Sequence, residues 1–228
     1  GQSDTNANLT RRILLLLESF PIGRREAYDR VQRNLLRRYL AEDRGFWSGA
    51  GSRKIPRFLL NDIARYWRTM AVDFAAKQRA RGNEGYALRN IKLRLSRKLI
   101  FLSGLLVCFS TEWDRPAFTQ AAGWPQPAQL LEAIEHHCRL LERDPLEQLA
   151  LALAKLPGLE KPTARLFASY DQFLDFLTAD KTLPNGKTLR RHLEELSLEA
   201  LDDDPVPGVV VGRRAVRPGA DDREVRPV

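Results

Sequence analysis

Two stretches near the middle of the chain, residues 56–78 and 87–104, repeat apolar and polar residues with the period of an α-helix. In each stretch an apolar residue returns every three or four positions, which is the pattern of a helix that buries one face. The polar segment between them, residues 79–86, contains Gly82 and Gly85, which interrupt helices. The pattern therefore predicts a long central αα-hairpin.

The same helical period recurs along most of the chain. We expect further helices over residues 10–20, 25–40, 127–143, 145–156, 163–179 and 187–201. Thr10 suits the N-cap of the first of them, and Pro56 suits the start of the first central helix, because a first-turn residue needs no N–H donor. Residues 42–55 hold three glycines and are expected to form a loop. The predicted fold class is all-α, a helical bundle.

Two changes in composition divide the chain into three parts. Residues 114–127 contain three prolines and a glycine, so we place an internal boundary just before them. It separates a basic helical region with the central hairpin, residues 1–110, from a C-terminal helical region packed on it, residues 111–201. After that the chain is rich in Pro, Gly and charge and loses the helical period, so residues 202–228 are predicted to be a disordered tail.

Length and composition describe a globular chain. Its 228 residues are enough for one large domain or two small domains with a buried core. Cys108 and Cys138 lie in apolar helical sequence, which favours two buried free thiols in a reducing cytosol over a disulfide. The apolar runs are too short to span a bilayer, so we expect a cytoplasmic protein without a membrane partner. The chain begins with Gly1 instead of Met, which suggests a fragment or a processed chain.

Basic residues are concentrated in the first part of the chain. Residues 1–100 hold 22 Lys and Arg against 9 Asp and Glu, whereas the remaining residues have a net charge of −5. A basic surface suits phosphate-bearing ligands such as a nucleotide or RNA. It equally suits a solvated face that docks an acidic neighbour, and charge alone does not choose between the two.

The sequence lacks the common catalytic signatures. It contains no Walker loop, no G-x-S-x-G turn and no H-E-x-x-H pair. A nucleotidyltransferase of the polymerase-β type needs a Gly-Ser turn followed by two acids at alternate strand positions, because the turn cradles phosphate and the acids hold Mg²⁺. Here Gly51 and Ser52 are followed by Asp62, but the next alternate residue is Ala64 and the context is helical. We therefore assign no catalytic residue, metal ligand or cofactor to this chain.

Three stretches nevertheless resemble a known group of proteins. Residues 8–19 (NLTRRILLLLES), 56–74 (PRFLLNDIARYWRTMAVDF) and 88–99 (LRNIKLRLSRKL) look like the helical region that follows the catalytic core in bacterial nucleotidyltransferases of the polymerase-β superfamily. The resemblance covers about residues 8–110 and is to a run of sequence, not to a catalytic signature. It implies that a catalytic domain precedes Gly1 in the same polypeptide and that this domain binds the NTP and Mg²⁺.

The resemblance implies an accessory helical domain, inactive alone, that closes the active-site cleft and helps to position nucleotide or acceptor. Polar side chains beside the apolar stripes of the hairpin are the candidates for substrate binding. They are Asn61, Asp62, Arg65, Arg68, Lys92 and Arg97. Cationic groups at four of these positions suit phosphate. Because all six belong to the hairpin, we expect the site between its two helices.

Each candidate also has a structural interpretation. For Asp62 and Lys92 we favour a buried ion pair between the two helices over direct ligand binding. Arg65 is also placed to pair with Asp62 along its own helix, and Tyr66 and Trp67 are expected in the core and not stacked on a base. Two other classes of function stay open. One is a stand-alone helical RNA-binding or toxin-like module, and the other is a structural protein-interaction domain.

Overall fold

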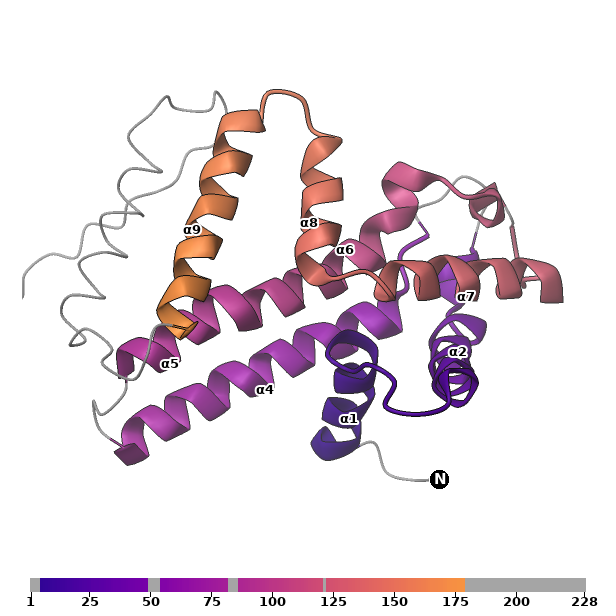
Figure 1. Cartoon of the computed structure of the whole chain (residues 1–228). Helices are drawn as coiled ribbons and strands as arrows, with labels where there is room; N and C mark the ends of the chain where they lie inside the picture. Colours follow the sequence, from indigo (N-terminus) through magenta and orange to yellow (C-terminus); the bar gives the residue numbers. More distant parts are fainter. Residues whose placement is uncertain (1–4, 49–53, 82–85, 121, 179–228) are drawn as a thin grey trace, which may run out of the picture.

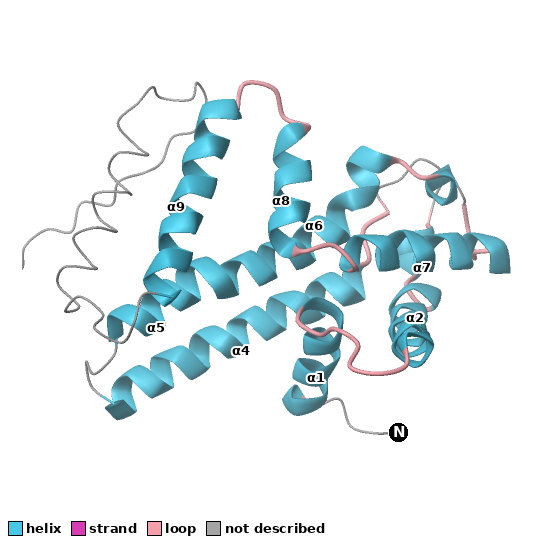
Figure 2. Cartoon of the chain, viewed as in Figure 1, coloured by secondary structure: helices cyan, strands magenta, loops and turns pink. Residues whose placement is uncertain are grey.

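The computed structural model describes residues 5–48, 54–81, 86–120 and 122–178. The regular secondary structure of these residues is helical, which confirms the all-α fold class (Figure 2). The helices are α1 (Asn6–Leu17), α2 (Arg25–Ala41), α3 (Arg44–Trp47), α4 (Arg57–Arg81), α5 (Tyr86–Lys92), the π-helix η1 (Leu93–Arg97), α6 (Lys98–Asp114), the 3₁₀-helix η2 (Ala117–Gln120), α7 (Pro127–Leu141), α8 (Pro145–Ala154) and α9 (Glu160–Thr178). The predicted helix over residues 187–201 and the predicted tail over residues 202–228 lie outside the described residues.

The predicted central hairpin is confirmed. Helices α4 and α6 run side by side in opposite directions, and α5 continues the line of α6 (Figure 1). Helices α1 and α2 pack against α4, and α7 packs against α2. Helix α8 stands on α6, and α9 returns beside α8 toward α5 (Figure 1). None of the helices in the described part of the chain is both long and apolar enough to cross a membrane.

Gly104 of α6 fixes the register of the hairpin. A Cβ atom at this position would lie 3.1 Å from side-chain carbons of Ile63 and 3.0 Å from Cδ1 of Leu17, so any larger residue would push these side chains aside. Ile63 and Gly104 therefore lie opposite each other. Lys92 precedes Gly104 by 12 residues. At 1.5 Å per residue, this separation is roughly 18 Å along the helix axis.

Several element boundaries differ from the sequence prediction, among them the start of α9 at Glu160, three residues before its predicted start. Helix α1 begins before Thr10, because the side chain of Thr5 accepts the N–H of Asn8 and caps the helix there. The predicted loop over residues 42–55 contains α3, which Asp43 caps by accepting the N–H of Phe46. Helix α4 continues to Arg81, three residues beyond its predicted end.

The second helix of the hairpin is interrupted by η1, where the sequence predicts one continuous helix. The N–H of Lys98 bonds to the carbonyl oxygen of Leu93, five residues earlier, which is the bonding pattern of a π-turn. Because a π-turn holds an additional residue, the side chains after it are rotated relative to those before it. The π-turn therefore sets the direction of the side chain of Arg97, its last residue.

One main hydrophobic core and one small cluster hold these helices together. The main core takes residues from α1, α2, α3, α4, α6, η2 and α7, and it buries Tyr66 as predicted. Trp67 is half-buried and stacks on Phe101, with ring centroids 5.2 Å apart. The small cluster joins Ile91 of α5 to Phe173 of α9. Helix α6 runs through the proposed division at residues 110 and 111.

Candidate functional site

Three of the six predicted site residues lie together on α4. Asn61, Arg65 and Arg68 are four and three residues apart, a spacing that places them on one side of an α-helix. Leu59 and Ile63, on the opposite side, are buried in the main core. Asn61 and Arg68 are exposed, and the Arg65 side chain is 40% exposed. We call Asn61, Arg65 and Arg68 the α4 arginine face.

Asp62 lies under the α4 arginine face and is only 6% exposed. Its Oδ2 atom accepts hydrogen bonds from Nη2 of Arg12 at 2.9 Å and from the hydroxyl of Tyr39 at 2.8 Å. Its Oδ1 atom accepts a longer bond, 3.4 Å, from Nη1 of Arg65. The Nε of Arg12 also donates to the hydroxyl oxygen of Tyr39 at 3.1 Å. One carboxylate therefore ties α1 and α2 to α4.

The predicted ion pair between Asp62 and Lys92 is wrong. Asp62 pairs with the partly buried Arg12, whereas Lys92 is exposed at the end of α5. The reason is the register of the hairpin. Asp62 is next to Ile63, which lies opposite Gly104, so Lys92 is several turns away along the axis. The helices are antiparallel as expected, but the residue opposite Asp62 comes from a later turn of the second helix.

Tyr39 serves this network as a hydrogen-bond donor. Burial raises the pKa of its hydroxyl above the ordinary value, and the hydrogen bond to the Asp62 carboxylate raises it further. At neutral pH the phenol is therefore protonated. Within this set of residues two guanidinium groups share one carboxylate, and Asp62 acts as a fixed support for the half-exposed Arg65. A guanidinium supported in this way is well suited to a second, exposed anion.

Arg97 belongs to a second polar cluster. Its Nη1 donates to Oε2 of Glu18 at 2.6 Å, and the hydroxyl of Tyr66 donates to Oε1 of the same carboxylate at 2.6 Å. Glu18 follows the last residue of α1, so the cluster joins α1, α4 and η1. Burial and the Glu18 carboxylate raise the pKa of the Tyr66 hydroxyl, which remains a donor. The six candidate residues are therefore not all brought together, because Arg97 bonds to Glu18 and Asp62 bonds to Arg12 and Tyr39.

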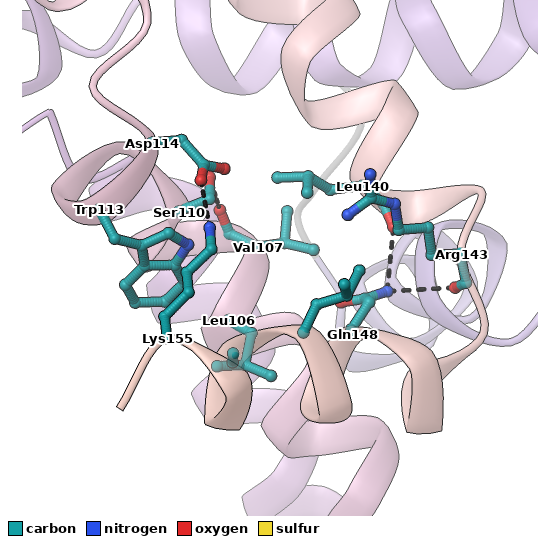
Figure 3. Close-up of a pocket in the computed structure, with 11 residues that line it drawn as sticks. Leu106, Val107, Ser110, Trp113, Asp114, Leu140, Arg143, Gln148 and Lys155 are labelled. Carbon is teal, nitrogen blue, oxygen red and sulfur yellow. Dashed lines mark hydrogen bonds and ion pairs between the residues drawn. The ribbon is translucent and has the colours of Figure 1, made fainter. Parts of the chain in front are cut away.

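A small cavity lies elsewhere, between α6, α7 and α8. Its volume is about 30 Å³, which is enough for a water molecule. None of the six predicted residues lines it. Its polar side chains are already engaged: Lys155 pairs with Asp114, and the amide of Gln148 donates to two carbonyl oxygens (Figure 3). The cavity therefore presents no converging polar groups to a ligand.

The histidines near this cavity are structural. Nε2 of His136 lies 2.8 Å from the hydroxyl of Ser110, and both residues are buried, at 6% and 1% exposure. The Ser110 hydroxyl also donates to the carbonyl oxygen of Val107. A nucleophile needs access to its substrate, and this pair has none in the structure. Within the described residues, no group of three His, Cys, Asp or Glu is placed to hold a metal ion.

Comparison with known proteins adds no family. No family model matches the chain, and neither the curated proteins nor the solved structures contain a match. The function must therefore be argued from the residues themselves.

The sequence analysis missed the partners that support the site. They are Arg12, Glu18 and Tyr39. One signal was present in the sequence. Arg12 adjoins Ile13, which belongs to the apolar stripe of the first helix, just as Asp62 adjoins Ile63. The criterion that selected polar residues beside the stripes of the hairpin would have selected Arg12 on the first helix too.

Proposed function

We propose that this chain is the accessory helical region of a bacterial nucleotidyltransferase, and that its α4 arginine face positions the phosphates of the nucleotide or the acceptor. The observation that carries the proposal is the pairing of exposed and buried charge on α4. Arg65 is half-exposed beside the exposed Arg68, and the buried carboxylate of Asp62 supports it from below. The resemblance of residues 8–110 to the helical region of such enzymes supports the same assignment.

The chemistry of nucleotidyl transfer is consistent with a helical region that binds phosphates and a separate domain that binds the metal ion. Much of its catalysis is positioning of the phosphates and neutralisation of their charge. Arginine serves this purpose because its guanidinium is always charged and forms two parallel hydrogen bonds to a phosphate. Within the described residues, no group of three His, Cys, Asp or Glu is placed to hold a metal ion. Binding of Mg²⁺ and of the NTP falls to the catalytic core of the complete protein, which we place in the cytoplasm.

The coding sequence upstream of Gly1 tests this proposal. We expect it to encode a small α/β domain with a Gly-Ser turn followed by an Asp-x-Asp or Asp-x-Glu pair, because these groups cradle phosphate and hold Mg²⁺. A reading frame without such a domain, and without a neighbouring gene that supplies one, would contradict the proposal. The purified chain alone is expected to show no EDTA-sensitive label transfer from an NTP.

A further inference from the structure

Glu18 is the counter-ion of an otherwise purely basic segment. Between residues 85 and 111 the sequence holds five Arg and Lys and no acidic residue. Within the described residues, the ion pair of this segment with a carboxylate is that of Arg97 with Glu18, which comes from α1. The carboxylate that balances part of the positive charge of this segment therefore comes from the end of α1, which is far away in the sequence.

The position of Glu18 is unfavourable for a carboxylate in one respect. It caps the C-terminal end of α1, where the helix dipole is negative and disfavours an anion. Two donors compensate for this: the hydroxyl of Tyr66 and the guanidinium of Arg97, each at 2.6 Å. The Arg97 side chain is 47% exposed, and Glu18 is 20% exposed, so solvent reaches both members of the pair. Both donors belong to elements other than α1, so movement of the Glu18 side chain alone would leave the half-exposed Arg97 and the buried Tyr66 hydroxyl without this acceptor.

We propose that Arg97 and Tyr66 form an anion seat, occupied by the Glu18 carboxylate in this structure, and that a phosphate group of a nucleotide or an RNA replaces that carboxylate. This inference rests on the proposed function only for the source of the phosphate. The shared chemistry is a phosphate with at least two free oxygens. The anion seat is distinct from the α4 arginine face, because Tyr66 is buried and bonds to Glu18 of the α1 C-cap, whereas Asn61 and Arg68 are exposed.

A phosphate suits this seat better than the internal carboxylate does. It carries more negative charge and more acceptor oxygens, and Glu18 uses only one of the five N–H donors of Arg97. Lys92 supplies a further exposed cation. It caps η1 five residues before Arg97, and in a π-turn residues at this spacing are one turn apart. The π-turn therefore places Lys92 about one turn from Arg97 along the helix.

Calorimetric titration of the full chain with tripolyphosphate at low salt tests the seat. We expect Glu18→Gln to raise the affinity about three-fold, because it removes the competing charge and keeps an acceptor for Tyr66. We expect Arg97→Ala to lower the affinity about ten-fold, as for loss of a charge-assisted hydrogen bond. Tyr66→Phe, which keeps the buried ring, should lower it about three-fold. A far-UV circular dichroism spectrum of each variant checks its fold.

The ion pair of Arg33 with Glu135 provides a matched control. It also joins two helices, with a 2.7 Å contact and side chains that are 45% and 37% exposed. Glu135→Gln removes the carboxylate from Arg33 as Glu18→Gln removes it from Arg97, but in the described part of the chain no hydroxyl donates to Glu135 as Tyr66 does to Glu18. The affinity should therefore stay within a factor of two, roughly the effect of one surface charge. Equal gains in both variants would show a non-specific response to net charge and would overturn the proposal. An unchanged or lower affinity of Glu18→Gln for both tripolyphosphate and the RNA of the parallel titration would overturn it too.

A parallel titration with a single-stranded RNA that lacks terminal phosphates identifies the source of the phosphate. If the affinities of the variants for tripolyphosphate follow the expected order, the seat takes the terminal phosphates of a free nucleotide. If it holds for RNA alone, the seat takes the RNA backbone. If it holds for neither, the seat does not exist. The upstream coding sequence tests the proposed function separately, so binding with the expected order and no upstream catalytic domain would reject that function and retain the seat.

Discussion

Arg12 and Asp62 are 50 residues apart in the chain and form an ion pair of 2.9 Å between α1 and α4. The side chains of Arg12 and Asp62 are 19% and 9% exposed, and the hydroxyl of Tyr39 bonds to both partners. Breaking a buried pair by removal of one partner is costly, because the other charge stays buried without compensation. The pair therefore supports the α4 arginine face from beneath, and removal of either partner should destabilise the fold.

Replacement of Asp62 should destabilise the protein far more than replacement of Lys92. Asp62→Ala leaves the guanidinium of Arg12 and the hydroxyl of Tyr39 without their acceptor, so we expect a loss of about 3 kcal/mol in the free energy of unfolding. Lys92 is exposed, so Lys92→Ala should change the free energy of unfolding by less than about 0.5 kcal/mol. Urea unfolding of both variants measures this difference. Equal effects would contradict the observed register of the hairpin.

A larger residue at position 104 should force the central helices apart. The Cβ of Gly104→Val would meet Leu17 and Ile63 at 3.0 to 3.1 Å, and its two methyl groups have no space between these side chains. We expect a loss of about 1–3 kcal/mol, as for other overpacked cores, despite the better helix propensity of a residue with a side chain. Thermal unfolding followed by circular dichroism checks this. Gly23→Val is the control, because nothing lies within 4 Å of the added Cβ.

Acid should weaken the fold through His137. Its ring is fully buried and burial lowers its pKa from 6.5 to about 4. The folded state therefore resists protonation between these values, whereas the unfolded state takes up a proton. Stability is highest above pH 6.5 and falls as the pH drops toward 4, by about 3 kcal/mol in total for this group.

Urea unfolding at pH 7 and at pH 4.5 measures the contribution of His137. The variant His137→Leu keeps an apolar side chain next to Phe46 and cannot be protonated, so its stability should depend less on pH than that of the unaltered chain. Burial lowers the pKa of His136 as well, so part of the dependence should remain in the variant. An equal dependence in both proteins would show that His137 is not the group responsible.

Much of the fold could be predicted from local sequence patterns. The start of α2 at Arg25, the start of α7 at Pro127 and the start of α8 at Pro145 agree with the predicted helices, because periodicity and helix-initiating prolines act over a few residues. The start of α1 was misplaced because two threonines compete for the cap, and only the hydrogen bond of Thr5 decides between them. The π-turn of η1 has no sequence signal that we recognise.

The candidate site was predicted only in part. Asn61, Arg65 and Arg68 share a helix, so their spacing alone places them on one face. The partners of Asp62 depend on contacts between helices that are distant in sequence, and these follow from the close approach at Gly104 and not from any local pattern. The same holds for Glu18 and Arg97, which are 79 residues apart.

Nucleotidyl transfer by the complete protein, with its catalytic core, tests the central claim most directly. The α4 arginine face should bind phosphate in the transition state, so Arg65→Ala and Arg68→Ala should each lower kcat/KM at least about ten-fold with little change in urea midpoint. Arg37→Ala, which removes an exposed arginine from α2, is the matched control and should retain full activity. Full activity of both α4 variants, or a loss no greater than that of the control, would contradict the account and favour a structural interaction domain.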